Sequence, residues 1–174
     1  MCGSIQTGRS LRGAAAATGL LLACACATVE PRPERPDPYR LELPRAGGGR
    51  VDFSAFRGRV LLVDFFTTWN QASLLAIPGL AGLHRRYAAR GLAVVGVALD
   101  ELGEDIVLPY AEGMDMPYPV ALASDRIRTG ESSFGELSAL PALFVFDTRG
   151  RLRKVLVGYV PVEDVERLVL SLLP

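Results

Sequence analysis

Two long runs of apolar residues dominate the hydrophobic pattern of this chain. They span Val60 to Phe66 and Leu92 to Leu99, and Asp64 is the only charged residue in either. Runs of this length that are rich in Val, Leu and Phe and lack polar alternation are typical of strands buried on both faces of a sheet. Both segments are therefore predicted to be central β-strands.

The segment between these runs has the spacing of an amphipathic helix. Apolar residues recur at helical intervals from Leu74 to Arg90. Pro78 is expected to kink or restart the helix, and Gly91 to end it, because glycine readily adopts the left-handed conformation found after helix ends. A second helix is predicted from Glu101 to Gly113.

The remaining pattern predicts short strands near both ends of the domain and a closing helix. A loop with a short helix is expected from Asp125 to Leu137. The other predicted elements are extended pieces at Leu41–Leu43 and Arg50–Phe53, a β-hairpin of Leu143–Phe146 and Leu152–Val157, and a helix at Val162–Leu173. Strands alternating with helices, followed by a hairpin and a helix, predict an α/β three-layer sandwich around a mixed sheet.

The first 23 residues have the layout of a targeting segment. Arg9 and Arg12 precede a short apolar run, Ala14 to Ala23, which is well below the roughly 20 residues that span a bilayer. The run ends in Leu-Leu-Ala before Cys24, which resembles a bacterial lipoprotein signal. That resemblance implies cleavage before Cys24, a lipid on its sulfur, and a periplasmic protein anchored to a membrane.

Two alternatives remain for this segment. The small residues around Cys24 and Cys26 also fit an ordinary signal peptidase site, which would release a soluble secreted protein. The two cysteines could instead form a C-x-C redox or metal pair, although two sulfurs without a nearby histidine make a poor metal site. After the signal at 1–23, we expect a proline-rich linker at 24–44 and a single domain at 45–174.

Composition and charge narrow the function classes. The chain has 174 residues, is 49% apolar and has a formal net charge of +0. This is enough for one core-bearing domain with tails, and the neutral balance argues against nucleic-acid binding, which favours a basic face. No cofactor and no metal are expected.

Several local motifs, in order, resemble one protein family. They are Phe53–Val60, similar to a lead-in of the form L-S-D-F-R-G-K-V, Val63–Trp69, Leu140-Pro141, and Asp147–Gly150 of the form D-x-x-G. Together they resemble the TlpA/ResA-like thiol–disulfide oxidoreductases, which have the thioredoxin fold and are periplasmic and membrane-tethered. The resemblance covers Leu41 to Leu173 and implies a cis peptide bond before Pro141.

The resemblance fails where the family's chemistry lies. The family's W-C-x-x-C motif falls on Trp69 to Ser73, which here reads Trp-Asn-Gln-Ala-Ser, so the two cysteines map onto Asn70 and Ser73. An acidic residue common in the family maps onto Ala76. Disulfide exchange requires a thiolate, and the only cysteines are Cys2, Cys24 and Cys26. We expect no catalytic residue at this site. Peroxiredoxin and copper-binding chemistry are excluded by the same missing sulfurs.

Asp64, Ser73 and His84 are the remaining candidates for chemistry. The resemblance implies that Asp64 is a buried acid that moves protons for the second cysteine; the alternative is a partly buried acid satisfied by Ser, Thr or water. Apolar surroundings would raise its pKa. A hydrolase built on Ser73 would need His84 as its base, but eleven residues of helix separate them by about 16 Å, far beyond the roughly 3 Å required. His84 is expected on the surface.

The leading hypothesis is therefore a binding protein without redox chemistry. The resemblance implies that an extended peptide pairs with the strand edge before the cis-proline. The predicted peptide-binding residues are Trp69, Asn70, Gln71, Ala72, Ser73, Leu140 and Pro141, although Trp69 could instead cover the helix start. The partner is expected to be a protein or peptide of the cell envelope. The rivals are an oxidoreductase that uses partner thiols or an N-terminal cysteine, and a structural module.

Overall fold

A five-stranded mixed sheet forms the centre of the domain. The computed structural model describes residues 36–174, so the predicted signal at 1–23, the lipidation of Cys24 and most of the linker lie outside it. The strand order is β5-β4-β3-β6-β7. The strands are β3 (Val60–Phe66), β4 (Leu92–Ala98), β5 (Val120–Leu122), β6 (Ala142–Phe146) and β7 (Leu152–Val157).

The two apolar runs of the sequence form the middle of this sheet. β3 pairs in parallel with β4 and antiparallel with β6. Every residue of these three strands is buried. The prediction of two central strands and a C-terminal hairpin, formed by β6 and β7, is confirmed.

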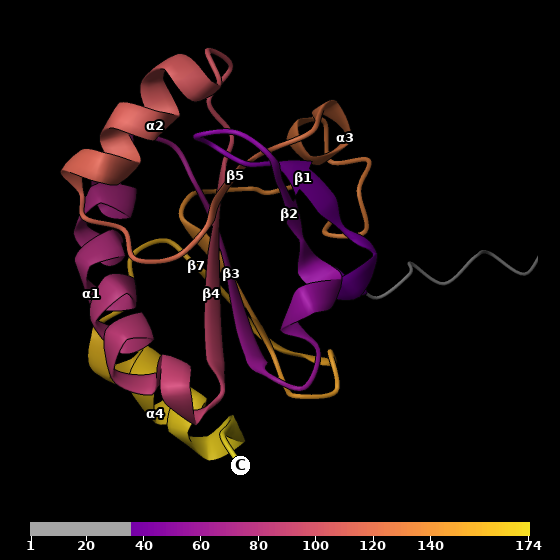
Figure 1. Cartoon of the computed structure of the whole chain (residues 1–174), viewed down its shortest axis with the longest axis vertical. Helices are drawn as coiled ribbons and strands as arrows, with labels where there is room; N and C mark the ends of the chain where they lie inside the picture. Colours follow the sequence, from indigo (N-terminus) through magenta and orange to yellow (C-terminus); the bar gives the residue numbers. More distant parts are fainter. Residues whose placement is uncertain (1–35) are drawn as a thin grey trace, which may run out of the picture. The chain divides into compact units, whose positions relative to one another are not determined.

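Helices cover one face of the sheet and a small hairpin covers the other (Figure 1). α1 (Gln71–Tyr87), α2 (Glu104–Gly113) and α4 (Val162–Leu172) lie on one side; α3 (Asp125–Arg128) and the β1–β2 hairpin lie on the other. Because side chains alternate along a strand, Leu62 of β3 packs with the helices and Val63 with the hairpin side. The predicted three-layer α/β sandwich is confirmed.

The packed domain begins before the expected boundary at residue 45. Pro38–Arg40 forms a 3-10 turn, and β1 (Glu42–Pro44) pairs antiparallel with β2 (Arg50–Asp52). Leu43 is buried in the core. Tyr39 packs so closely over Gly150 that a Cβ at position 150 would clash with the tyrosine ring. The last part of the predicted linker, residues 38–44, therefore belongs to the domain.

Two further details differ from the sequence prediction. β5 was not predicted, because three residues carry too little pattern to distinguish a strand from a loop. His84 is half-buried rather than on the surface, and its ring meets that of Tyr118 at a centroid distance of 5.8 Å. Burial is the main cause that lowers the pKa of His84, followed by the charges of Arg59 and Arg85. No helix of residues 36–174 has the length and apolar character needed to cross a membrane.

Candidate functional site

The loop that follows β3 is held in place by an acid that follows β4. Parallel pairing of β3 and β4 brings Phe66 beside Ala98, so the segments after both strands meet at one edge of the sheet. Asp100, which is buried, accepts hydrogen bonds from the Thr68 backbone N–H at 3.1 Å and from the Thr68 hydroxyl at 2.7 Å. Sequence reasoning missed Asp100, although its position directly after a buried parallel strand places it at this edge.

Trp69 lies on the surface at the same edge. Its side chain is 76% exposed, and that of Leu102, in the segment after β4, is 72% exposed. Both residues line one shallow hollow with a volume of about 300 Å³. Trp69 therefore does not cover the start of α1, and its large apolar side chain is available to a partner.

Asn70, at the expected position of the first cysteine, stabilises the start of α1. Its Oδ1 accepts hydrogen bonds from the backbone N–H groups of Ala72 at 2.8 Å and Ser73 at 3.1 Å, which makes it the N-cap of α1. Its Nδ2 donates to the Leu140 carbonyl at 3.2 Å. Asn70 thus ties the start of α1 to the residue before Pro141, and the Leu140–Pro141 peptide bond is cis.

Ser73, at the position of the second cysteine, is inside the protein. Its exposed fraction is 0%, and its hydroxyl has no hydrogen-bond partner among residues 36–174. No base contacts this hydroxyl, so the structure gives no support to a serine hydrolase. Of the predicted peptide-binding residues, Gln71 is exposed, Ala72 and Leu140 are half-buried, and Pro141 is buried beside the site.

Asp64 is a buried acid whose carboxylate has no hydrogen-bond partner among residues 36–174. It is 1% exposed, and neither carboxylate oxygen forms a hydrogen bond within the described part of the chain. Burial raises the pKa of Asp64 to about 7, because desolvation disfavours the charged form. No serine or threonine of residues 36–174 contacts this carboxylate, and the acid is fully rather than partly buried. The direction of the pKa shift is the one expected for apolar surroundings.

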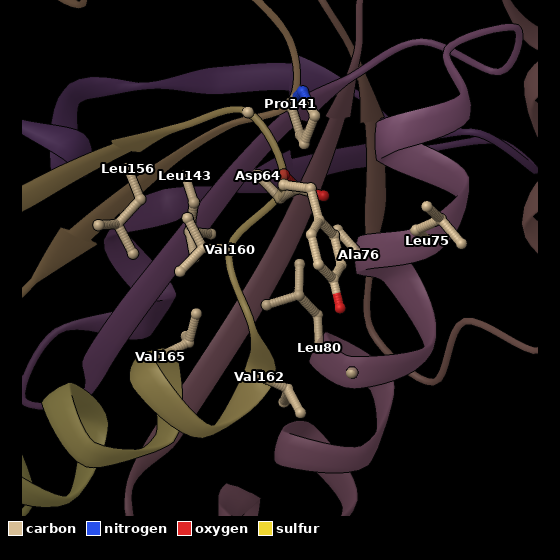
Figure 2. Close-up of a pocket in the computed structure, with 13 residues that line it drawn as sticks. Asp64, Leu75, Ala76, Leu80, Pro141, Leu143, Leu156, Val160, Val162 and Val165 are labelled. Atoms are coloured by element: carbon tan, nitrogen blue, oxygen red, sulfur yellow. The ribbon is translucent and has the colours of Figure 1, made fainter.

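A pocket lies next to Asp64, between the sheet, α1 and α4 (Figure 2). Its volume is about 130 Å³. Asp64 and Pro141 lie at one end of it, and Leu80, Val162 and Val165 lie toward the other. Ala76, at the position of the family's acidic residue, is also in its wall and leaves space for it. Sequence reasoning identified Asp64, Ala76 and Pro141 but did not predict a pocket.

The described residues do not suggest a metal centre. Within residues 36–174, no group of three or more His, Cys, Asp or Glu side chains is arranged to hold a metal ion. The site consists instead of an exposed apolar edge around Trp69, the bridge made by Asn70, and the pocket beside Asp64.

Comparisons with known proteins agree with this fold. The family model described as AhpC/TSA family matches residues 36–155. The thiol-disulfide oxidoreductase ResA of Bacillus subtilis is 25% identical over 152 residues, which cover 81% of this chain and 83% of ResA. Protein DipZ of Mycobacterium tuberculosis is 30% identical over 131 residues, 73% of this chain but 18% of DipZ.

A solved structure has a similar fold. A thiol:disulfide interchange protein of the thioredoxin family from Chlorobium tepidum superposes with a TM-score of 0.70 and 28% identity, covering 83% of this chain and 99% of that chain. The region matched by the family model contains no cysteine. The chain therefore belongs to the AhpC/TSA family, with the thioredoxin-like fold and with ResA-like thiol–disulfide oxidoreductases among its relatives.

Proposed function

We propose that this domain binds an extended segment of a partner protein or peptide at the edge of the sheet around Trp69, without thiol–disulfide chemistry of its own. The observation that carries the proposal is that Asn70 and Ser73 both have structural environments in which neither can react with a disulfide. The polar groups of Asn70 are used for the helix cap and the bridge to Leu140, and Ser73 is fully buried. Neither residue is placed to attack a disulfide.

The exposed apolar side chains at this edge support a binding role. Trp69 and Leu102 are more than 70% exposed and line the same hollow. Apolar side chains gathered on a surface mark interaction sites more often than scattered ones do. Tryptophan is among the residues that most often dominate binding energy at interfaces.

The segment before Pro141 supports an extended mode of binding. The Leu140 carbonyl already accepts from Asn70, whereas the Leu140 N–H donates no hydrogen bond within residues 36–174. A free N–H beside a half-buried side chain can pair with the carbonyl of an incoming strand, as in β-augmentation. One strand residue of a partner would thus be positioned next to Trp69 and Asn70.

The proposal includes a location outside the cytoplasm, with the domain tethered through a lipid on Cys24. It rests on the layout of residues 1–23, which lie outside the described residues. Mass spectrometry of the mature N-terminus tests it: a diacylglyceryl group on Cys24 is expected, whereas cleavage after Ala27 would instead indicate a secreted soluble protein.

A second candidate function is that of a thiol–disulfide oxidoreductase, and it is favoured by the similarity to ResA and to the thiol:disulfide interchange protein of Chlorobium tepidum. In this chain such activity would have to use the thiols of a partner or of Cys24 and Cys26. A lipid on Cys24 would remove one of those thiols from the reaction.

Binding can be tested with an array of overlapping peptides from cell-envelope proteins. The full-length chain is expected to retain a subset of extended peptides, and Trp69→Ala or Leu102→Ala to lose them. The matched control is Leu170→Ala, which also removes an exposed apolar side chain (42% exposed) but from α4. Peptide binding that survives Trp69→Ala and Leu102→Ala, or that Leu170→Ala weakens as strongly, would contradict the proposed surface.

A further inference from the structure

The pocket beside Asp64 has an apolar wall and one acidic group. Eleven of its thirteen lining residues carry aliphatic side chains or are glycine, and the two exceptions are Asp64 and Tyr159. Tyr159 is 52% exposed, so this part of the wall reaches the surface. Figure 2 shows Leu80, Leu143, Val160 and Val165 around the space, with Asp64 near Pro141.

Small residues in the pocket wall leave room for this space. Ala76 on α1 leaves space near the sheet, while at Gly79, one turn later, α1 comes so close to α4 that an added Cβ would lie 3.0 Å from Cβ of Val162. Gly158 has φ of +77°, which glycine adopts readily, and its N–H donates to the Pro141 carbonyl at 2.7 Å. The pocket is thus walled by two helices, the sheet and the turn after β7.

The carboxyl group of Asp64 faces this space without a donor or cation to pair with among residues 36–174. Its two oxygens lack hydrogen-bond donors, and none of the salt bridges found within residues 36–174 includes it. Because no hydrogen bond holds the carboxylate, a rotation about its last torsion toward the pocket breaks none. A buried carboxylate is stabilised when a cation with hydrogen-bond donors pairs with it.

We propose that this pocket binds a small organic cation, in which one ammonium group pairs with Asp64 and a short aliphatic body fills the apolar space. A water molecule at Asp64 would fill only part of a volume of about 130 Å³ and would leave the apolar wall without contacts. An anion is excluded by the charge of Asp64. The proposal does not rest on peptide binding: Trp69 and Leu102 line a different hollow, and of the predicted peptide-binding residues Pro141 alone lines this pocket.

The titration of Asp64 gives the proposal a pH signature. The other titratable groups near Asp64 are tyrosines: Tyr159 in the pocket wall, Tyr110 of α2, and Tyr118 before β5. The pKa values of Tyr110 and Tyr118 are raised mainly by burial, with a smaller contribution from the charge of Asp64. No other titratable side chain of α1 or α4 lines the pocket. Since Asp64 has a pKa of about 7, an ammonium ion should bind about thirtyfold more weakly at pH 5.5 than at pH 8.

The experiment is a titration of the full-length protein followed by NMR, with n-butylammonium as the probe and n-butanol and butyrate as neutral and anionic probes of similar size. We expect butylammonium to bind with the pH dependence above and to lower the pKa of the Asp64 carboxyl. Nα-acetyl-lysine methylamide, compared with butylammonium, distinguishes a lysine side chain from a free amine as the source of the cation.

Two variants make the test specific. Asp64→Asn keeps the shape of the side chain and should weaken butylammonium binding by about tenfold or more. Ala76→Leu fills the pocket and should abolish binding while Asp64 remains. Ala89→Leu, at an exposed position beyond α1, is the matched control and should bind normally. Equal binding of butanol and butylammonium, binding unchanged in Asp64→Asn, or no shift with any probe would each overturn the proposal.

Discussion

At the scale of single residues, two positions where the sequence resemblance predicts thiols hold Asn70 and Ser73. Asn70 stands where a thiol would be expected in the family, and it caps α1 and bridges to Leu140. Ser73 replaces the second thiol with a small buried hydroxyl. Asp64 is still present as a buried acid, although the part of the chain that the structure describes contains no thiol with which it could exchange a proton.

Replacing Asn70 should separate its two structural contributions. Asn70→Ala removes the cap and the bridge to Leu140, so the free energy of unfolding should fall by about 1–2 kcal/mol. Asn70→Ser keeps a capping oxygen but cannot reach Leu140, so it should lose roughly half as much. Urea unfolding measures both. Equal stability of Asn70→Ala and the wild type would show that neither contact contributes.

Asp64 should give the protein a distinctive pH dependence of stability. Its pKa is about 7 in the folded state against an ordinary value of 3.8, so between these pH values the folded state holds a proton that the unfolded state has released. The free energy of unfolding should therefore fall as pH rises from about 4 to 7, by roughly 4 kcal/mol at most, and level off above pH 7.

Asp64→Asn serves as the reference for this effect. The contributions of the other titratable groups are the same in both proteins, so they cancel in the difference between the two unfolding free energies. The difference in unfolding free energy between variant and wild type, measured with urea at pH 5 and pH 8, should shift in favour of Asp64→Asn at the higher pH. A difference that does not change with pH would mean that Asp64 titrates as an ordinary solvated acid.

At the scale of elements, the closeness of α1 and α4 sets the shape of the pocket. Gly79 is the contact point: a Cβ there would lie 3.0 Å from the Val162 Cβ and 3.1 Å from its Cγ2. Gly82 lies on the same helix, but its nearest neighbour would be the flexible end of Arg86 at 3.6 Å. The two glycines therefore provide a matched pair.

Alanine at these two positions should have opposite effects. Gly82→Ala should stabilise the protein by about 0.5–1 kcal/mol, because alanine is the better helix former. Gly79→Ala gains the same propensity but forces α1 and α4 apart, so it should destabilise by about 1–2 kcal/mol. Thermal unfolding of both variants measures this. Stabilisation by both would contradict the close α1–α4 contact.

The elements show which parts of the fold a sequence can reveal. The unbroken apolar runs of β3 and β4 and the helical spacing of α1 were sufficient to predict these three elements. In each case the pattern of apolar residues within one segment indicates the element. β5 was not predictable from three residues. The start of α1 was placed three residues late, because the capping role of Asn70 depends on its side-chain geometry.

At the scale of the whole molecule, the candidate site was predicted only where it is local in sequence. Trp69, Asn70 and Pro141 were found from motifs. Leu102 and Tyr159 were missed because only the folded chain brings them to the site, whereas the position of Asp100 directly after a buried strand was a signal that the sequence contained. The burial of Ser73 and the pocket at Asp64 depend on packing among α1, α4 and the sheet. Likewise, the domain starts earlier than predicted because Tyr39 and Leu43 pack onto distant segments.

The central claim is a thioredoxin-like domain that acts by binding rather than by thiol exchange. Its most direct test is insulin reduction by the full-length chain, compared with a variant in which Cys2, Cys24 and Cys26 are serine, and with Asn70→Cys/Ser73→Cys made in that variant. We expect the wild type to match the cysteine-free variant, and the restored C-x-x-C pair to gain turnover on an intact scaffold. Turnover by the wild type above that of the cysteine-free variant would contradict the account and assign the activity to the N-terminal cysteines.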